Sequence, residues 1–320
     1  MTLWLHVGSH KTGTTSIQRT FDASRRVLDR AGIVYPTNIV GEIYRGRTSL
    51  KSHLFVSQSV REGRVATHLE AFARAYPGRD MLLSSEHFEK LSHDERKLLA
   101  KTAATYFGDV RVIAYFREPL GLAVSRLSTW IKRGEALFDG GRAKVQHYRY
   151  IDQLGGWRQA FGPDNVIVRP FDRAAFPGGD IMDDLFAVMG LDPAKVKLRR
   201  ETDNERMTLR GALAIDALAA RLGSVPEPLR LEAARLPGPR LSLPQATLDA
   251  VTERSAADVA RLAERFGVIL PQSNEVALET LAPMDVSADV ERLMAGMAAP
   301  AERGAAGIFG KLRRLRLARR

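Results

Sequence analysis

Residues 6–18 read HVGSHKTGTTSIQ and connect an apolar stretch to a segment with helical spacing. Gly8 and Gly13 have the spacing of the phosphate loop G-x-x-x-x-G-K-[ST], in which a lysine directly follows the second glycine. Here a threonine follows Gly13, and the lysine lies inside the loop as Lys11. The pattern predicts a strand, an anion-binding turn and a helix N-terminus, with the lysine displaced from its usual place.

Strands and helices alternate around this loop. Strands are expected over 2–7, 80–85, 110–116 and 165–171, and helices over 14–31, 92–107, 119–132 and 148–161. The strands are apolar without alternation, which is typical of a parallel sheet covered on both faces. Residues 37–63 are polar and show no strong period, so we expect an irregular segment there. The sequence therefore predicts an α/β fold, a P-loop-like parallel sheet flanked by helices, with a helical C-terminal region.

The chain changes character after residue 200. It becomes helical, with a proline-rich link over 225–244 and a helix over 245–266. We expect three parts: an α/β core over 1–200, a helical part of the same domain over 201–300, and a basic tail over 301–320.

Composition narrows the class of protein. The chain has 320 residues and a net charge of +11, but residues 303–320 hold seven Lys and Arg and no acid, which leaves +4 for the remainder. The basicity is thus largely a property of the tail. The absence of cysteine excludes disulfides, thiolate metal sites and cysteine catalysis. No signal-peptide pattern and no apolar run of about 18 residues is present, so we expect a cytoplasmic protein.

A second motif, REPLGLAVS, occupies residues 117–125. Arg117 follows the strand expected over 110–116, and Ser125 lies eight residues later on the next helix. A guanidinium and a hydroxyl can bind one phosphate together. Combined with the loop, this second anion site indicates a nucleotide that carries phosphates at two different positions.

The pair HKTGTT and REPLGLAVS resembles the family of sulfotransferases that use 3′-phosphoadenosine 5′-phosphosulfate (PAPS), over roughly residues 1–170. The resemblance implies that the core binds PAPS and that no metal is needed. The 5′-phosphosulfate would be bound by Lys11, Thr12, Gly13, Thr14 and Thr15, with His10 as a flanking contact, and the 3′-phosphate by Arg117 and Ser125. The K-T-G-T-T spelling is similar to that of carbohydrate-modifying and bacterial members, which implies a hydroxyl-bearing acceptor, such as a carbohydrate.

The chain departs from the family pattern at several positions. Gly121 and Leu127 stand where many members have Asp and Tyr, and Ser16 replaces a tryptophan that contacts adenine in the small-molecule branch. The C-terminal glycine- and lysine-containing nucleotide motif of that branch is missing. These departures leave the residues that hold adenine unassigned.

In-line transfer to a hydroxyl needs a base within hydrogen-bond reach of the acceptor. The family uses Glu or His, and the end of the strand over 80–85 offers Glu86 and His87. We favour Glu86, the first residue past the strand, with His53 as its rival. The resemblance places Lys11 beside the bridging oxygen of the donor, where it neutralises charge on the leaving phosphate.

Two other functions stay open. One is a P-loop kinase that uses ATP and Mg²⁺, although the strand over 110–116 ends in Arg117 and not in a metal-binding Asp. The other is a nucleotide-binding protein that has lost catalysis.

The basic tail has a separate set of interpretations. If helical, it is amphipathic and suited to peripheral contact with an anionic membrane; the alternative is a solvated tail. We expect no nucleic-acid partner, because the tail has few aromatic residues between its arginines.

Overall fold

A computed structural model describes residues 1–8, 11–36, 53–142, 145, 148–192, 196, 198–200 and 207–296. The chain divides into two compact units. The first comprises Met1–Leu122, His147–Asn204 and Val251–Asn274, and the second comprises Ala123–Gln146, Glu205–Ala250 and Glu275–Arg320.

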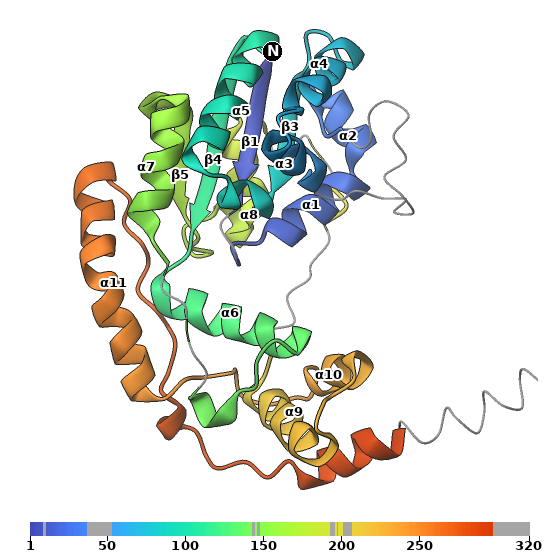
Figure 1. Cartoon of the computed structure of the whole chain (residues 1–320), viewed down its shortest axis with the longest axis vertical. Coiled ribbons are helices and arrows are strands. Elements are labelled where there is room, and N and C mark those ends of the chain that lie inside the picture. The colour runs from blue at the N-terminus through green and yellow to red at the C-terminus, as the bar shows by residue number, and fades with distance from the viewer. Residues whose placement is uncertain are drawn as a thin grey trace, which may run out of the picture. The chain divides into compact units, whose positions relative to one another are not determined.

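The first unit is built on a five-stranded sheet with the order β2-β3-β1-β4-β5, in which every pair of neighbours is parallel (Figure 1). The strands are β1 Thr2–Val7, β2 Ile33–Val34, β3 Asp80–Ser85, β4 Asp109–Phe116 and β5 Val166–Pro170. The predicted α/β fold with a parallel sheet is confirmed. β2 was not predicted, because its two residues are too few to give a periodic signal.

Helices surround this sheet. They are α1 Thr14–Ala23, α2 Arg25–Arg30, α3 Leu54–Arg61, α4 Val65–Ala75, α5 His93–Tyr106, α7 Tyr150–Phe161 and α8 Ile181–Val188. Ser92 caps α5 in a capping box with Glu95. The helix predicted over 14–31 is in fact two helices that meet at Ser24, whose hydroxyl accepts a hydrogen bond from the amide of Arg199. The expectation of an irregular 37–63 segment was wrong for α3, which is short but buries Phe55 and Val56.

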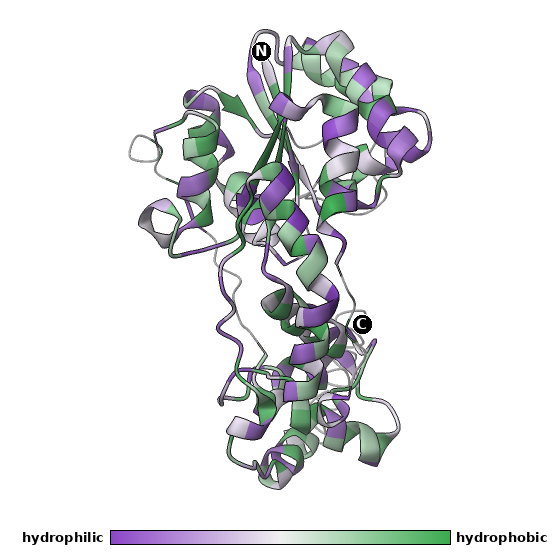
Figure 2. Cartoon of the chain, turned by 90° about the vertical axis from the view of Figure 1, so that its left-hand side faces the viewer, coloured by the Kyte–Doolittle hydropathy of each residue, from purple (hydrophilic) through white to green (hydrophobic). Residues whose placement is uncertain are grey.

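Both faces of the sheet are covered by apolar side chains. Along β1, Leu3, Leu5 and Val7 join one cluster with residues of α3, α4, α5 and α7. Trp4 points to the opposite face and joins a cluster with α1, α2 and α8. Figure 2 shows the strands as the hydrophobic centre of this unit, with hydrophilic positions on the helices around them. This two-sided burial explains why the strand sequences do not alternate.

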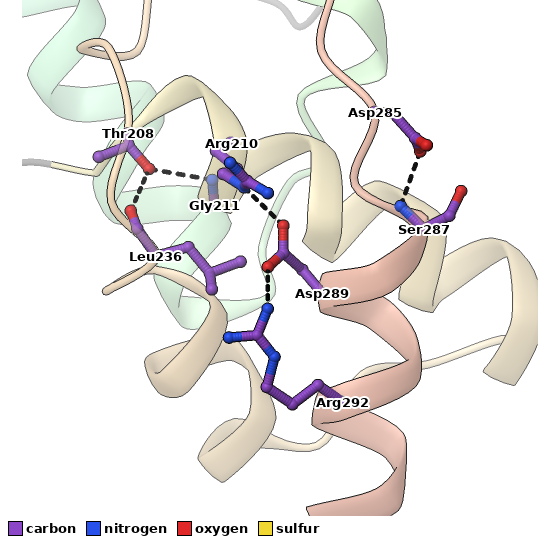
Figure 3. Close-up of polar contacts among 8 residues, drawn as sticks. All are labelled: Thr208, Arg210, Gly211, Leu236, Asp285, Ser287, Asp289 and Arg292. Carbon is purple, nitrogen blue, oxygen red and sulfur yellow. Dashed lines mark hydrogen bonds and ion pairs between the residues drawn. The ribbon is translucent and has the colours of Figure 1, made fainter.

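The second unit is helical. It contains most of α6 Pro119–Arg133, α9 Leu209–Leu222, α10 Glu227–Ala233, the first residues of α11 Gln245–Phe266 and a helix over 287–296. Thr208 caps α9 by accepting from the amide of Gly211 (3.0 Å), and its hydroxyl donates to the carbonyl of Leu236 (2.7 Å; Figure 3). The buried Asp289 pairs with Arg210 of α9 and with Arg292 (Figure 3), which fastens the helix over 287–296 to α9.

In the part of the chain that the structure describes, no helix combines the length and the apolar character needed to cross a bilayer. The predicted membrane contact of the tail falls on residues outside the described ranges.

The attachment of α8 to the sheet gives a test of the fold. Asp184 is buried, accepts from the hydroxyl of Tyr115 (2.8 Å) and forms an ion pair with Arg169 (2.5 Å). The Asp184→Ala variant removes the acceptor of the Tyr115 hydroxyl and the ion-pair partner of Arg169, so we expect its free energy of unfolding to fall by about 3 kcal/mol. Chemical denaturation measures this, with the exposed Asp164→Ala as a control that changes it by less than about 0.5 kcal/mol. Equal losses of stability in the two variants would contradict the role of Asp184 in attaching α8 to the sheet.

Candidate functional site

Three segments leave neighbouring strands at one edge of the sheet. Val7, the last residue of β1, pairs with Ser85, the last residue of β3. β4 lies on the other side of β1, and its last residue is Phe116. The loop that begins at Gly8, the acidic residue Glu86 and the basic residue Arg117 therefore follow the carboxyl ends of three adjacent parallel strands. Ligands of open α/β sheets bind at such an edge.

The loop closes tightly on the start of α1. A Cβ atom at Gly8 would lie 2.2 Å from Oγ1 of Thr14, so only glycine fits there. Gly13 has a φ of 77° and serves as the N-cap of α1. A Cβ at Gly13 would also lie 3.3 Å from Ile181 of α8. Both glycines of the predicted motif are thus required by the backbone and its neighbours.

Lys11 adopts a left-handed backbone conformation, with a φ of 69°. A side chain other than glycine costs roughly 1–2 kcal/mol in this region. Such strain concentrates at functional sites, where the surrounding structure imposes it. The next residue, Thr12, is completely buried. The displaced lysine therefore combines an unfavourable backbone conformation with a buried neighbour in the loop.

The start of α1 is suited to an anion. Its first turn carries no acidic residue, and no side chain caps it. Oγ1 of Thr14 is buried without a hydrogen-bond partner, while Thr15 is exposed. Unpaired amides and the helix dipole at such a terminus attract negative charge. His10, the other predicted contact in the loop, lies outside the described residues.

The Arg117 segment is fixed through its backbone. The hydroxyl of Tyr150, on α7, donates to the carbonyl of Arg117 (2.6 Å). Pro119 begins α6, as predicted. Ser125 lies on α6 and is partly buried, but it belongs to the second unit. Its cooperation with Arg117 stays a prediction.

Glu86 opens a short 3₁₀ segment, Glu86–Lys90, directly after β3. The hydroxyl of Ser85 caps this segment by accepting from the amide of His87 (3.2 Å). Glu86 and His87 are both partly exposed. The acid that the sequence favours as a base therefore lies at the sheet edge with access to solvent.

His53 has a different environment from Glu86, because its ring is completely buried. Its Nδ1 accepts from the amide of Ser84 (2.8 Å), so the ring proton is on Nε2 and is donated to the carbonyl of Pro36 (2.8 Å). Burial lowers the pKa of His53 to about 4. The lone pair that a base would use is already engaged, and we therefore do not propose His53 as the base.

Ser84 lies at the centre of a buried hydrogen-bond network that the sequence did not predict. β2 ends before reaching it, and His53 satisfies both of its backbone groups: the ring accepts from its amide, and the amide of His53 donates to its carbonyl (2.9 Å). The hydroxyl of Ser84 lies 2.8 Å from Nδ1 of the buried His6, and Gln18 of α1 donates to the Ser84 carbonyl (3.3 Å). This network joins β1, α1 and the end of β3, two residues before Glu86.

A hollow of about 470 Å³ lies elsewhere on the first unit, at the amino end of β4. It is lined by Lys97, Lys101, Phe107, Asp109 and Phe161, among others. None of the predicted site residues borders it, so we place the candidate site at the opposite edge of the sheet. Within the described ranges, no cluster of three His, Asp or Glu side chains is arranged to hold a metal.

The similarity of this chain to known proteins is low. No protein-family model matches the chain. An uncharacterized protein of Archaeoglobus fulgidus is 26% identical over 126 residues, which cover 35% of this chain and only 30% of that relative. A solved sulfotransferase from Alicyclobacillus acidocaldarius aligns with 83% of this chain and 96% of its own, with 17% identity and a TM-score of 0.41. This TM-score is too low to assign an activity to the chain.

The strain at Lys11 can be measured with two variants that lose the same charge. Lys11→Gly relieves the left-handed conformation, whereas Lys11→Ala retains it. We expect the glycine variant to be more stable than the alanine variant by about 1 kcal/mol in chemical denaturation. A more stable alanine variant would show that residue 11 does not need the left-handed conformation.

The buried His53 gives a second test. Its removal leaves the amide of Ser84 unpaired and opens a cavity, so we expect His53→Ala to lower the free energy of unfolding by about 3 kcal/mol. Glu86→Ala, at a partly exposed position, should change it by less than about 1 kcal/mol. A stable His53→Ala variant would argue against the structural role of this ring.

The same ring predicts a pH dependence. The pKa values of His6 and His53 are about 4 in the folded chain and near 6.5 when unfolded. As the pH falls from 6.5 to 4, the unfolded chain binds protons that the folded chain cannot, and stability is lost. We expect the wild type to lose more stability across this window than His53→Ala, by about 3 kcal/mol. Parallel pH profiles would contradict the burial of His53 as a neutral ring.

Proposed function

We propose that the chain is a sulfotransferase that transfers the sulfuryl group of PAPS to a hydroxyl, by in-line displacement. The acceptor class we propose is a carbohydrate or a related compound, on the basis of the K-T-G-T-T spelling. The donor supplies an activated sulfuryl group, and the chain supplies the groups that bind it and move the proton.

The register of three strands carries this proposal. It brings the loop after β1, Glu86 after β3 and Arg117 after β4 to one edge of the sheet. The loop offers a helix N-terminus without an acid and a buried, unpaired hydroxyl on Thr14, which fit the 5′-phosphosulfate. Arg117 is the group we propose for the 3′-phosphate.

The roles of the other residues follow from their chemistry. Glu86 takes the proton of the acceptor hydroxyl as its oxygen bonds to sulfur. Lys11 neutralises the charge that develops on the phosphate oxygen as the bond from that oxygen to sulfur breaks. The proposed mechanism needs neither a metal nor a covalent intermediate.

One observation is also consistent with a P-loop kinase. Glu86 is an acid at the end of the strand next to β1, and P-loop kinases hold Mg²⁺ with a strand-end acid and a hydroxyl of the loop. The location of Arg117 at the end of β4 favours the two-phosphate donor instead. Nucleotide preference separates these two functions.

The decisive experiment is calorimetric binding of 3′,5′-ADP against ATP with Mg²⁺. We expect the wild type to prefer 3′,5′-ADP, because both of its phosphates find a basic partner. Arg117→Ala should weaken the binding of 3′,5′-ADP by about tenfold to a hundredfold and leave the binding of 5′-AMP nearly unchanged. Lys11→Ala should weaken the binding of both 3′,5′-ADP and 5′-AMP.

Glu86→Gln completes the experiment. It should bind 3′,5′-ADP within about twofold of the wild type, and lose at least about a hundredfold in transfer to any carbohydrate that the wild type sulfates. The kinase function would be favoured over the sulfotransferase function if the wild type prefers ATP with Mg²⁺, if Arg117→Ala keeps this preference, and if Glu86→Gln loses it. Tight binding of 3′,5′-ADP without transfer to any acceptor would favour an inactive nucleotide-binding protein.

A further inference from the structure

The carboxylate of Glu118 occupies the N-terminus of α6, immediately after Arg117. Its Oε1 accepts from the amide of Gly121 (2.7 Å) and so caps the helix. Only 9% of Glu118 is exposed, and its second oxygen, Oε2, is buried without a hydrogen-bond partner. A buried carboxylate with one oxygen unmatched is costly, which indicates a role other than stabilising the helix.

Gly121 allows this carboxylate to lie beside the guanidinium of Arg117. A Cβ at Gly121 would lie 2.0 Å from Oε1 of Glu118, 2.9 Å from Nη2 of Arg117 and 3.0 Å from its Nε. Both head groups therefore occupy the space over the first turn of α6 that a side chain at position 121 would fill. An anion that binds Arg117 approaches a buried negative charge.

We propose that Glu118 is a built-in counter-charge that limits the affinity of Arg117 for the 3′-phosphate. This inference rests on the proposed function, in which Arg117 binds that phosphate. Charges removed from water interact strongly and are poorly screened by salt. The carboxylate therefore opposes the phosphate without touching it, and it does so for as long as the nucleotide is bound.

The consequence is faster release of the product nucleotide. After transfer, 3′,5′-ADP retains both phosphates that the site binds, so a site that bound them too tightly would be slow to turn over. Release of product limits many enzymes. Differences in affinity between related complexes are expressed chiefly in the dissociation rate, and we therefore place the effect of Glu118 on that rate.

Two neutral variants test this role. Glu118→Gln keeps an oxygen that can accept from the amide of Gly121, and Glu118→Ser supplies a favoured capping hydroxyl. In both, we expect the Kd for 3′,5′-ADP to fall by about tenfold, with slower dissociation in stopped-flow measurements. The Kd for 5′-AMP, which lacks the 3′-phosphate, should stay within about twofold of the wild type.

The matched control is Asp109→Asn. It removes one negative charge at the amino end of β4, the strand that leads into Arg117 and Glu118, where Asp109 pairs with Arg111. It should leave both Kd values unchanged. Thermal unfolding of each variant, with and without 3′,5′-ADP, separates altered binding from altered folding.

The outcomes are distinguishable. If the wild type binds 3′,5′-ADP no better than 5′-AMP, the proposed function and this inference both fall. If the wild type prefers 3′,5′-ADP and the neutral variants bind it no tighter, only the role of Glu118 is overturned. Weaker binding in both variants would also overturn it, because the carboxylate would then favour binding of the nucleotide and not oppose it. Equal tightening for both nucleotides would contradict an effect confined to the 3′-phosphate.

Discussion

The parallel pairing of β1 with β3 on one side and with β4 on the other is the constraint on which the candidate site depends. It brings three segments that are far apart in the sequence to one edge of the sheet. The register is held because both faces are buried: a slip of one residue would exchange the environments of Leu3 and Trp4. The core of the first unit thus positions groups that do not themselves belong to the core.

The buried network around Ser84 extends this constraint to the acid. His53 takes the place of a strand where β2 has ended, and His6 and Gln18 tie the same residue to β1 and α1. Glu86 follows two residues later, so its backbone position is set by neutral, buried side chains. This explains how a partly exposed carboxylate can be held in place although no strand continues on the β2 side of β3.

Much of this arrangement could be predicted from local signals in the sequence. The paired glycines, the apolar runs and Pro119 mark the loop, four of the five strands and the start of α6, because each depends on residues that are close in the sequence. β2 and the role of His53 could not be predicted. β2 is too short to show a period, and His53 acquires its role only through contact with Ser84, 31 residues away.

A loop that binds one phosphate group and an arginine that binds another, at one edge of a parallel sheet, is the central claim about this chain. A crystal structure of the complex with 3′,5′-ADP tests it most directly. We expect the 5′-phosphate at the amides of residues 11–15 and the 3′-phosphate on the guanidinium of Arg117. A nucleotide bound with its 3′-phosphate away from Arg117, or at another edge of the sheet, would contradict the claim.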